Sequence, residues 1–237
     1  MALPKLGVPT YELILPSTGK TVKYRPFLVK EEKLLLLAME SESEKEVISA
    51  VKTLLKNCVI SRIKVDNLPS FDLEYLFLKI RAAAVSEIIE LTVTCTDDNE
   101  TEVKAQIDLS EVEVEKEEGH TNKIMLDDDT GIVMKYPSMD RFIDSQFLNR
   151  DVKTEEVFEF ISEHVDSIFQ GDEVFDSTTT SKKEFRTFIE SLTSKQFESI
   201  QQFYETMPRL THTFTVKNPN TDKECEYTIE GLQSFFA

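Results

Sequence analysis

The alternation of apolar and polar residues near the start of the chain predicts a β-hairpin. Residues 11–15 have the pattern of a strand, and residues 21–24 have the pattern of the strand that returns. The loop between them contains Gly19, which can adopt the positive φ that a tight turn requires. Pro26 ends the second strand because it has no N–H to donate, and a helical pattern begins near Lys30.

Two further amphipathic segments complete the first half of the chain. Residues 43–60 and residues 69–85 carry apolar side chains at spacings of three and four, which predicts helices. Ser70 is the expected N-cap of the second of these helices. Alternating residues at 90–95 and 101–109 then predict a closing hairpin.

The second half repeats this order of elements. Residues 123–136 predict a hairpin with Gly131 in its turn, followed by a helical pattern that begins at Met139. Helices are expected over residues 154–169 and 194–207, and a closing hairpin is expected over residues 212–229.

Smaller features complete the prediction for the second half. Thr154 and Ser194 are the expected N-caps of its two helices. An additional segment, residues 172–192, contains a polar loop and then a helical pattern from Lys182. Residues 117–121 are the expected linker between the two halves.

This pattern predicts an α+β fold made of two related units, each a helical layer flanked by antiparallel β-hairpins. The expected units are residues 1–116 and residues 117–237. Agreement of the elements in type and order favours a duplication. The alternative is that the two halves are unrelated and agree by chance, because hairpins and helices are common elements. The small number of identical residues between the halves leaves this alternative open.

Composition narrows the classes of function. The chain has 27 Lys and Arg but 44 Asp and Glu, a formal net charge of −17, which disfavours binding to nucleic acid. No apolar run approaches the roughly 20 residues that span a bilayer, so a membrane location is not expected. The start of the chain has no signal-peptide pattern, and its three Cys are sparse. Both features predict a reducing, cytoplasm-like compartment.

Known catalytic and cofactor motifs are absent from the sequence, so no catalytic residue, cofactor or metal is predicted and the chain is expected not to be an enzyme. Residues 127–129 are three successive Asp, but they lack the ligand spacing of a calcium loop and suit a solvated hairpin tip. Zinc ribbons carry Cys pairs on hairpins, whereas each closing hairpin here has a single Cys, Cys95 or Cys225.

Two short segments resemble a known family. Residues 23–33, KYRPFLVKEEK, and residues 230–236, EGLQSFF, are similar to segments of the baseplate hub assembly proteins of T-even-type tailed bacteriophages. The layout of most of the chain resembles that family as well. The resemblance implies a non-enzymatic tail protein that is needed to build the central hub of the baseplate. It leaves the oligomeric state open, and the acidic charge and short apolar runs predict no nucleic-acid or membrane partner.

The same two segments supply the candidate partner-binding residues. Arg25 and Phe27 could contact a partner, or Arg25 could pair locally with Glu31 or Glu32. The C-terminal candidates could insert into a groove on a partner, or could cover the core of the second half. These candidates are Leu232, Phe235 and Phe236.

The resemblance implies other baseplate hub and tail proteins as partners, in the cytoplasm of the infected bacterial host or in the tail baseplate of the virion. An assembly factor or chaperone is the first hypothesis. A stoichiometric structural subunit of the hub is the second. A small enzyme using the acidic loop at Asp127 and Asp129 is a third, from another class.

Overall fold

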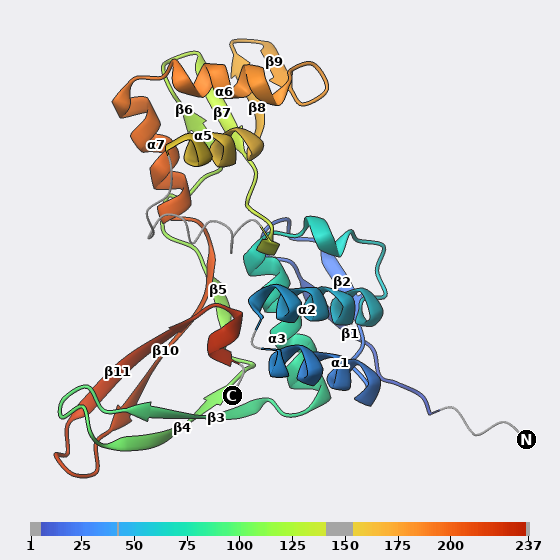
Figure 1. Ribbon diagram of the computed structural model, residues 1–237, viewed down its shortest axis with the longest axis vertical. Coiled ribbons are helices and arrows are strands. Elements are labelled where there is room, and N and C mark those ends of the chain that lie inside the picture. Colours follow the sequence, from blue (N-terminus) through green and yellow to red (C-terminus); the bar gives the residue numbers. More distant parts are fainter. Residues whose placement is uncertain (1–5, 42, 141–153, 236–237) are drawn as a thin grey trace, which may run out of the picture. The chain divides into compact units, whose positions relative to one another are not determined.

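The computed structural model describes residues 6–41, 43–140 and 154–235 of the chain (Figure 1). Over these residues the chain forms helices and small antiparallel sheets, and each sheet has between two and four strands. The predicted α+β class is therefore confirmed. The predicted helical residues that follow Met139, including Phe142 and Phe147, lie outside the described residues.

The chain divides into two compact units that are not the predicted halves. Unit 1 combines Met1–Glu115 with Arg209–Ala237, and unit 2 is Lys116–Pro208. The closing hairpin of the second half thus belongs to the unit formed by the first half. The physical reason is backbone pairing, since a short strand just before residue 116 pairs with the first strand of that hairpin.

Unit 1 begins with the predicted hairpin and three helices. The turn residue Gly19 has a φ of 67°, as its role requires, and Tyr11 pairs with Tyr24 across the hairpin. Buried apolar residues of the second strand, α2 and α3 form much of the core here. The elements are β1 (Tyr11–Ile14), β2 (Thr21–Tyr24), α1 (Val29–Glu40), α2 (Glu44–Cys58), η1 (Val65–Asn67) and α3 (Ser70–Ala84).

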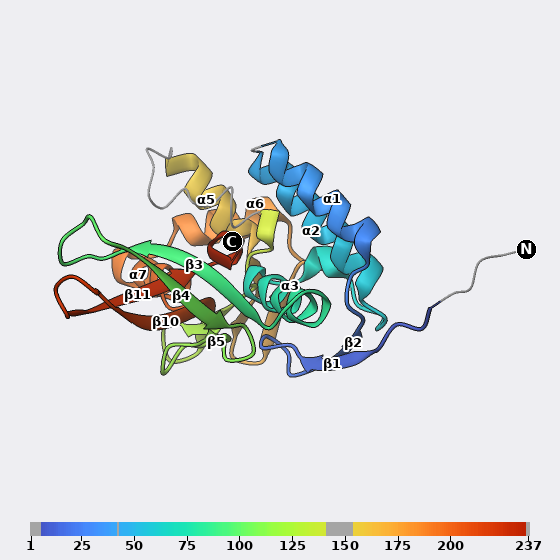
Figure 2. The ribbon, with the colours of Figure 1, turned by 90° about the horizontal axis from the view of Figure 1, so that it is seen from below.

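Two long hairpins complete unit 1 and lie beside each other (Figures 1 and 2). Their facing sides share one apolar cluster, to which Leu109, Leu210 and Phe235 contribute. Tyr227 also donates a hydrogen bond from its hydroxyl to the carbonyl of Thr94, at 2.6 Å, and so links the hairpins directly. The elements are β3 (Ile88–Thr94), β4 (Glu102–Asp108), β5 (Glu113–Glu115), β10 (Arg209–Lys217), β11 (Glu224–Glu230) and η3 (Leu232–Phe235).

Unit 2 is a four-stranded antiparallel sheet with helices packed against it. The strands follow the order β6, β7, β8, β9, and their apolar residues share a core with the three helices. The elements are β6 (Lys123–Met125), β7 (Thr130–Met134), α5 (Thr154–Glu163), β8 (Val165–Gln170), β9 (Glu173–Asp176), α6 (Lys182–Glu190) and α7 (Ser194–Glu205).

The prediction of one helix over residues 154–169 is wrong in its second part. Helix α5 ends at Glu163, and Val165–Gln170 forms strand β8 between β7 and β9. The spacing of Val165 and Ile168 fits a helix, but hydrogen bonding of this segment to β7 on one side and β9 on the other makes it a strand. His164 is buried at this junction, where its Nδ1 lies 2.7 Å from the carbonyl oxygen of Phe160.

Two predicted helix caps are displaced by one residue. Ser70 and Ser194 are the first helical residues of α3 and α7 rather than their N-caps. Thr193 caps α7 instead, because its hydroxyl accepts a hydrogen bond from the N–H of Gln196. The side chain of Thr154 lies outside the described residues.

The two halves of the chain differ in their order of elements, since β8 and β9 add two strands to the opening hairpin of the second half. The linker prediction also changes, because His120 is buried within unit 2 between Thr206 and Tyr136. None of the helices in the described part of the chain is long and apolar enough to cross a membrane.

Candidate functional sites

Arg25 lies where β2 leads into α1, and its guanidinium is engaged locally. It donates to the carboxylate of Glu31 at 3.1 Å and to the carbonyl oxygens of Pro26 and Asn57 at 2.9 and 3.0 Å. These contacts fasten the start of α1 to the end of α2. The local alternative for Arg25 is therefore the one that the structure shows, and Phe27 beside it is buried.

Glu31 completes this arrangement from inside the first turn of α1. Its second carboxylate oxygen accepts a hydrogen bond from the N–H of Leu28 at 2.9 Å. Burial alone would raise the pKa of Glu31, but the bonds from Leu28, Arg25 and Lys30 lower it below its ordinary value. A buried carboxylate with three donors is a structural anchor for the helix start.

The C-terminal candidates are also covered within the chain. Leu232 and Phe235 are buried in η3, and Phe235 belongs to the apolar cluster under the two hairpins of unit 1. The segment thus covers the core of unit 1, whereas the sequence placed it over the second half. Phe236 lies outside the described residues.

Glu74 on α3 receives this C-terminal segment. Its carboxylate accepts a hydrogen bond from the N–H of Leu232 at 3.3 Å, just after Gly231, whose φ is 73°. Burial, with a smaller contribution from Glu230, raises the pKa of Glu74 to about 8. The side chain is therefore mostly protonated at neutral pH and still accepts this bond through its carbonyl oxygen.

Helix α1, whose start is held by Arg25 and Glu31, carries several large apolar side chains that are exposed. Val29 is 78% exposed, Leu36 54% and Leu37 53%, while Leu34 and Met39 are more than one third exposed. We call these five residues the α1 face. The opposite side of the helix, which includes Leu35 and Ala38, packs against the rest of unit 1.

The α1 face is the surface that sequence reasoning missed. Four successive leucines, residues 34–37, point in every direction around a helix, so a single core-facing side cannot bury all of them. Large apolar side chains that stay exposed on a helix mark a candidate interaction surface. The four leucines carried that signal in the sequence, but none of them was among the predicted partner-binding residues.

The acidic loop at residues 127–129 is an exposed hairpin tip. One carboxylate oxygen of Asp127 accepts hydrogen bonds from the N–H groups of Asp129 and Thr130, at 2.9 and 2.6 Å. These bonds lower the pKa of Asp127 and shape the turn. The side chain of Asp127 thus stabilises the hairpin turn in which it lies.

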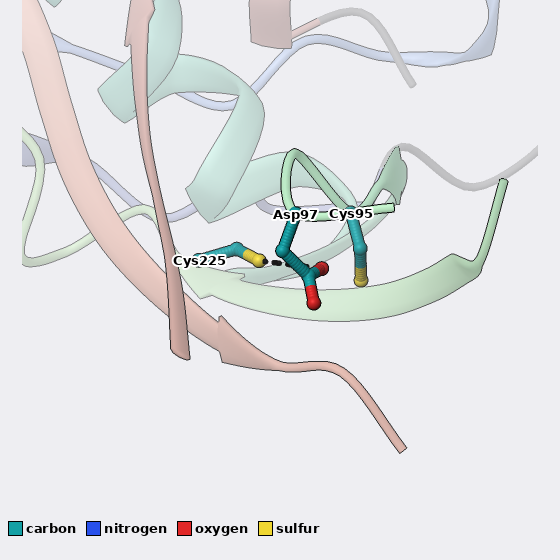
Figure 3. Close-up of side chains that lie close together, drawn as sticks. All are labelled: Cys95, Asp97 and Cys225. Carbon is teal, nitrogen blue, oxygen red and sulfur yellow. Dashed lines mark hydrogen bonds between the residues drawn. The ribbon is translucent and has the colours of Figure 1, made fainter. Parts of the chain in front are cut away.

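Cys95 and Cys225 come together although they are far apart in sequence. Cys95 directly follows β3, Asp97 lies in the turn that comes next, and Cys225 lies near the start of β11. Their ligand-type atoms all lie within 4.8 Å of one another. In Figure 3 the Cys225 side chain points toward the Asp97 carboxylate, and the Cys95 side chain lies beside that of Asp97. The sequence placed the two Cys on corresponding hairpins but did not bring them together, and it did not single out Asp97.

A comparison with protein-family models identifies the family of the chain. The family described as T4 bacteriophage base plate protein matches residues 8–237. The chain therefore belongs to the T4-type phage baseplate protein family, as its two resembling segments implied. Searches of the curated proteins and of the solved structures give no match.

Proposed function

We propose that this baseplate protein acts without catalysis, by binding other baseplate proteins during assembly of the central hub. Membership of the baseplate family supports a role among tail proteins. The observation that carries the binding mode is the α1 face, where five large apolar side chains of one helix remain exposed in the isolated chain. Burying such side chains against a partner stabilises a complex by about 25 cal/mol per Å² of apolar surface.

The anchors beneath α1 favour a rigid docking surface. Arg25 and Glu31 fix the start of the helix, and Leu35 and Ala38 hold its inner side against unit 1. A partner can then bind a helix that is already ordered, so little conformational entropy is lost on binding. We assign Arg25 and Phe27 to support of this surface rather than to direct contact.

An assembly factor that leaves the finished particle is the first form of this proposal. A stoichiometric structural subunit of the hub is the second, and the breadth of the α1 face favours it. Permanent interfaces are larger and more apolar than transient ones. Five exposed apolar side chains on one helix suit an interface of this permanent kind.

The experiment that separates these forms counts copies of the chain. Tagged protein is recovered from phage-infected cells, and purified virions are analysed by quantitative mass spectrometry. Recovery with hub proteins but absence from virions identifies an assembly factor. A fixed ratio to hub proteins in virions identifies a structural subunit. Failure to recover any tail protein, together with absence from virions, contradicts both forms.

A further inference from the structure

The two hairpin ends of unit 1 carry a cluster that the proposed binding function does not use. Cys95 and Asp97 come from the β3–β4 hairpin, and Cys225 comes from the β10–β11 hairpin. Both thiols are buried, whereas Asp97 is partly exposed. The sulfur of Cys225 lies 3.4 Å from Oδ1 of Asp97 (Figure 3).

A set of hydrogen bonds holds the Asp97 carboxylate in position. Asn218, which has no exposed surface, donates from its side-chain nitrogen to Asp97 at 2.8 Å and to Asp98 at 2.9 Å. The hydroxyl of Thr221 donates to the other oxygen of Asp97. Outer hydrogen bonds of this kind orient the ligands of metal sites.

The backbone around Cys95 is fixed as well. Its N–H donates to the carbonyl of Thr101 at 2.7 Å, and its carbonyl accepts from Asn99 at 2.8 Å. Asn99 adopts a φ of 57°, so the turn closes tightly behind the cysteine. The thiol is thereby held in place before any ligand arrives.

The donor set selects the class of ligand. Two sulfurs and one carboxylate oxygen suit zinc, whereas magnesium and calcium take oxygen ligands alone. Metal–sulfur bonds of about 2.3 Å and metal–oxygen bonds of about 2.0 Å in a tetrahedron separate neighbouring ligand atoms by about 3.5–3.8 Å. The sulfur of Cys225 lies 3.4 Å from Oδ1 of Asp97, and all three ligand atoms lie within 4.8 Å of one another, so the observed distances lie on both sides of that range.

We propose that Cys95, Asp97 and Cys225 bind one zinc ion. Each thiol loses its proton to the solvent when its sulfur binds the ion, so two thiolates and one carboxylate face a divalent cation. Water takes the fourth position and completes the tetrahedron. The bound ion joins the two hairpins of unit 1 at a place where no covalent bond links them.

The test uses the reduced full-length chain and cobalt(II), whose absorption reports ligand type and geometry. Titration is expected to give a thiolate-to-cobalt charge-transfer band and the visible bands of a tetrahedral site, saturating at one equivalent. Zinc should displace the cobalt, whereas magnesium should not. Cys95→Ser and Cys225→Ser each leave one thiolate in the cluster, so neither variant should reach the charge-transfer intensity of the two-thiolate site.

Two further variants make the test specific. Cys58→Ser removes a buried thiol outside the cluster and should leave the titration unchanged. Thr221→Val keeps all three ligands but removes a hydrogen bond to Asp97, and it should weaken binding by roughly 10-fold or more. The proposal is overturned if the reduced chain gives no thiolate band in excess cobalt, or if the band survives in the Cys95→Ser and Cys225→Ser double variant.

Discussion

The N–H of Leu232 donates a hydrogen bond to the buried carboxyl group of Glu74 at 3.3 Å. This contact joins α3 to the C-terminal segment, which lies more than 150 residues later in the chain. It explains how Phe235 can be held in the core of unit 1 rather than presented to a partner. The contact also links the stability of unit 1 to pH.

Glu74→Gln should remove a pH dependence from unit 1. The pKa of Glu74 is raised to about 8 in the folded state, so its contribution to stability is complete below its unfolded value near 4.5 and declines as pH rises toward 8. Between pH 5.5 and 8.5 the free energy of unfolding should fall by on the order of 3 kcal/mol in the parent chain. In the variant this component should be absent.

Protection factors from hydrogen exchange at amides of α3 and η3 measure this effect for unit 1 alone. Glu102→Gln, an exposed change of the same type on β4, is the matched control and should keep the parent pH dependence. An identical pH dependence in the parent chain and in Glu74→Gln would show that Glu74 is not the responsible group.

Gly131→Ala should destabilise unit 2. A Cβ at this position would lie 2.3 Å from the ring of Phe169 and 2.7 Å from the carbonyl oxygen of Ile124, and the latter cannot move without disturbing the β6–β7 pairing. Overpacking of this kind costs about 1–3 kcal/mol, which urea unfolding followed by circular dichroism can measure.

A second substitution tests the cause of the Gly131 effect. Phe169→Leu shortens the side chain that the new Cβ would meet, so in combination with Gly131→Ala it should recover part of the lost stability. Strict additivity of the two changes would contradict the clash with the Phe169 ring.

Arg25→Met should destabilise unit 1 by leaving the carboxylate of Glu31 buried with fewer donors. The side chain of Arg25 is 18% exposed and that of Glu31 only 1%, so the loss should be roughly 2–3 kcal/mol, below that of a fully buried pair. Adding Glu31→Gln removes the unpaired charge and should restore part of the stability in chemical denaturation.

Lys23→Met is the control for Arg25. Its ion pair with Glu12 is exposed on both sides, so its removal should change the free energy of unfolding by less than about 1 kcal/mol. Equal losses for Arg25→Met and Lys23→Met would contradict the anchoring role given to Arg25.

Local patterns in the sequence were sufficient to predict several elements. The turn around Gly19 and the alternation on both sides fixed the first hairpin. Helix α1 begins next to its predicted start, and α2 and α3 begin and end within a few residues of their predicted bounds. The acidic tip at residues 127–129 was also predictable, because the side chain of Asp127 accepts hydrogen bonds from residues two and three positions later in its own turn. Such features depend on neighbours in sequence.

The features that the sequence did not predict depend on contacts between residues far apart in the chain. Residues 165–170 have a spacing that fits a helix or a strand, and the pairing with β7 and β9 selects the strand. The three residues of β5 are too few to predict a partner, yet they join the closing hairpin to unit 1. Cys225 meets Asp97 from a distant hairpin, and no local pattern records that contact.

The measurement that tests partner binding most directly compares two charge-matched variants of unit 1 in a pull-down from phage-infected cells. The double variant Leu36→Glu and Leu37→Glu adds two negative charges to the α1 face, and Lys20→Glu changes the net charge by the same amount at an exposed position in the β1–β2 turn. Exposed sites should tolerate both changes, which circular dichroism verifies.

The double variant is predicted to lose its baseplate partners, while Lys20→Glu retains them. Phage yield in a complementation assay should follow the same order. Recovery of the same baseplate proteins, in the same amounts, by both variants and the parent chain would contradict binding through the α1 face.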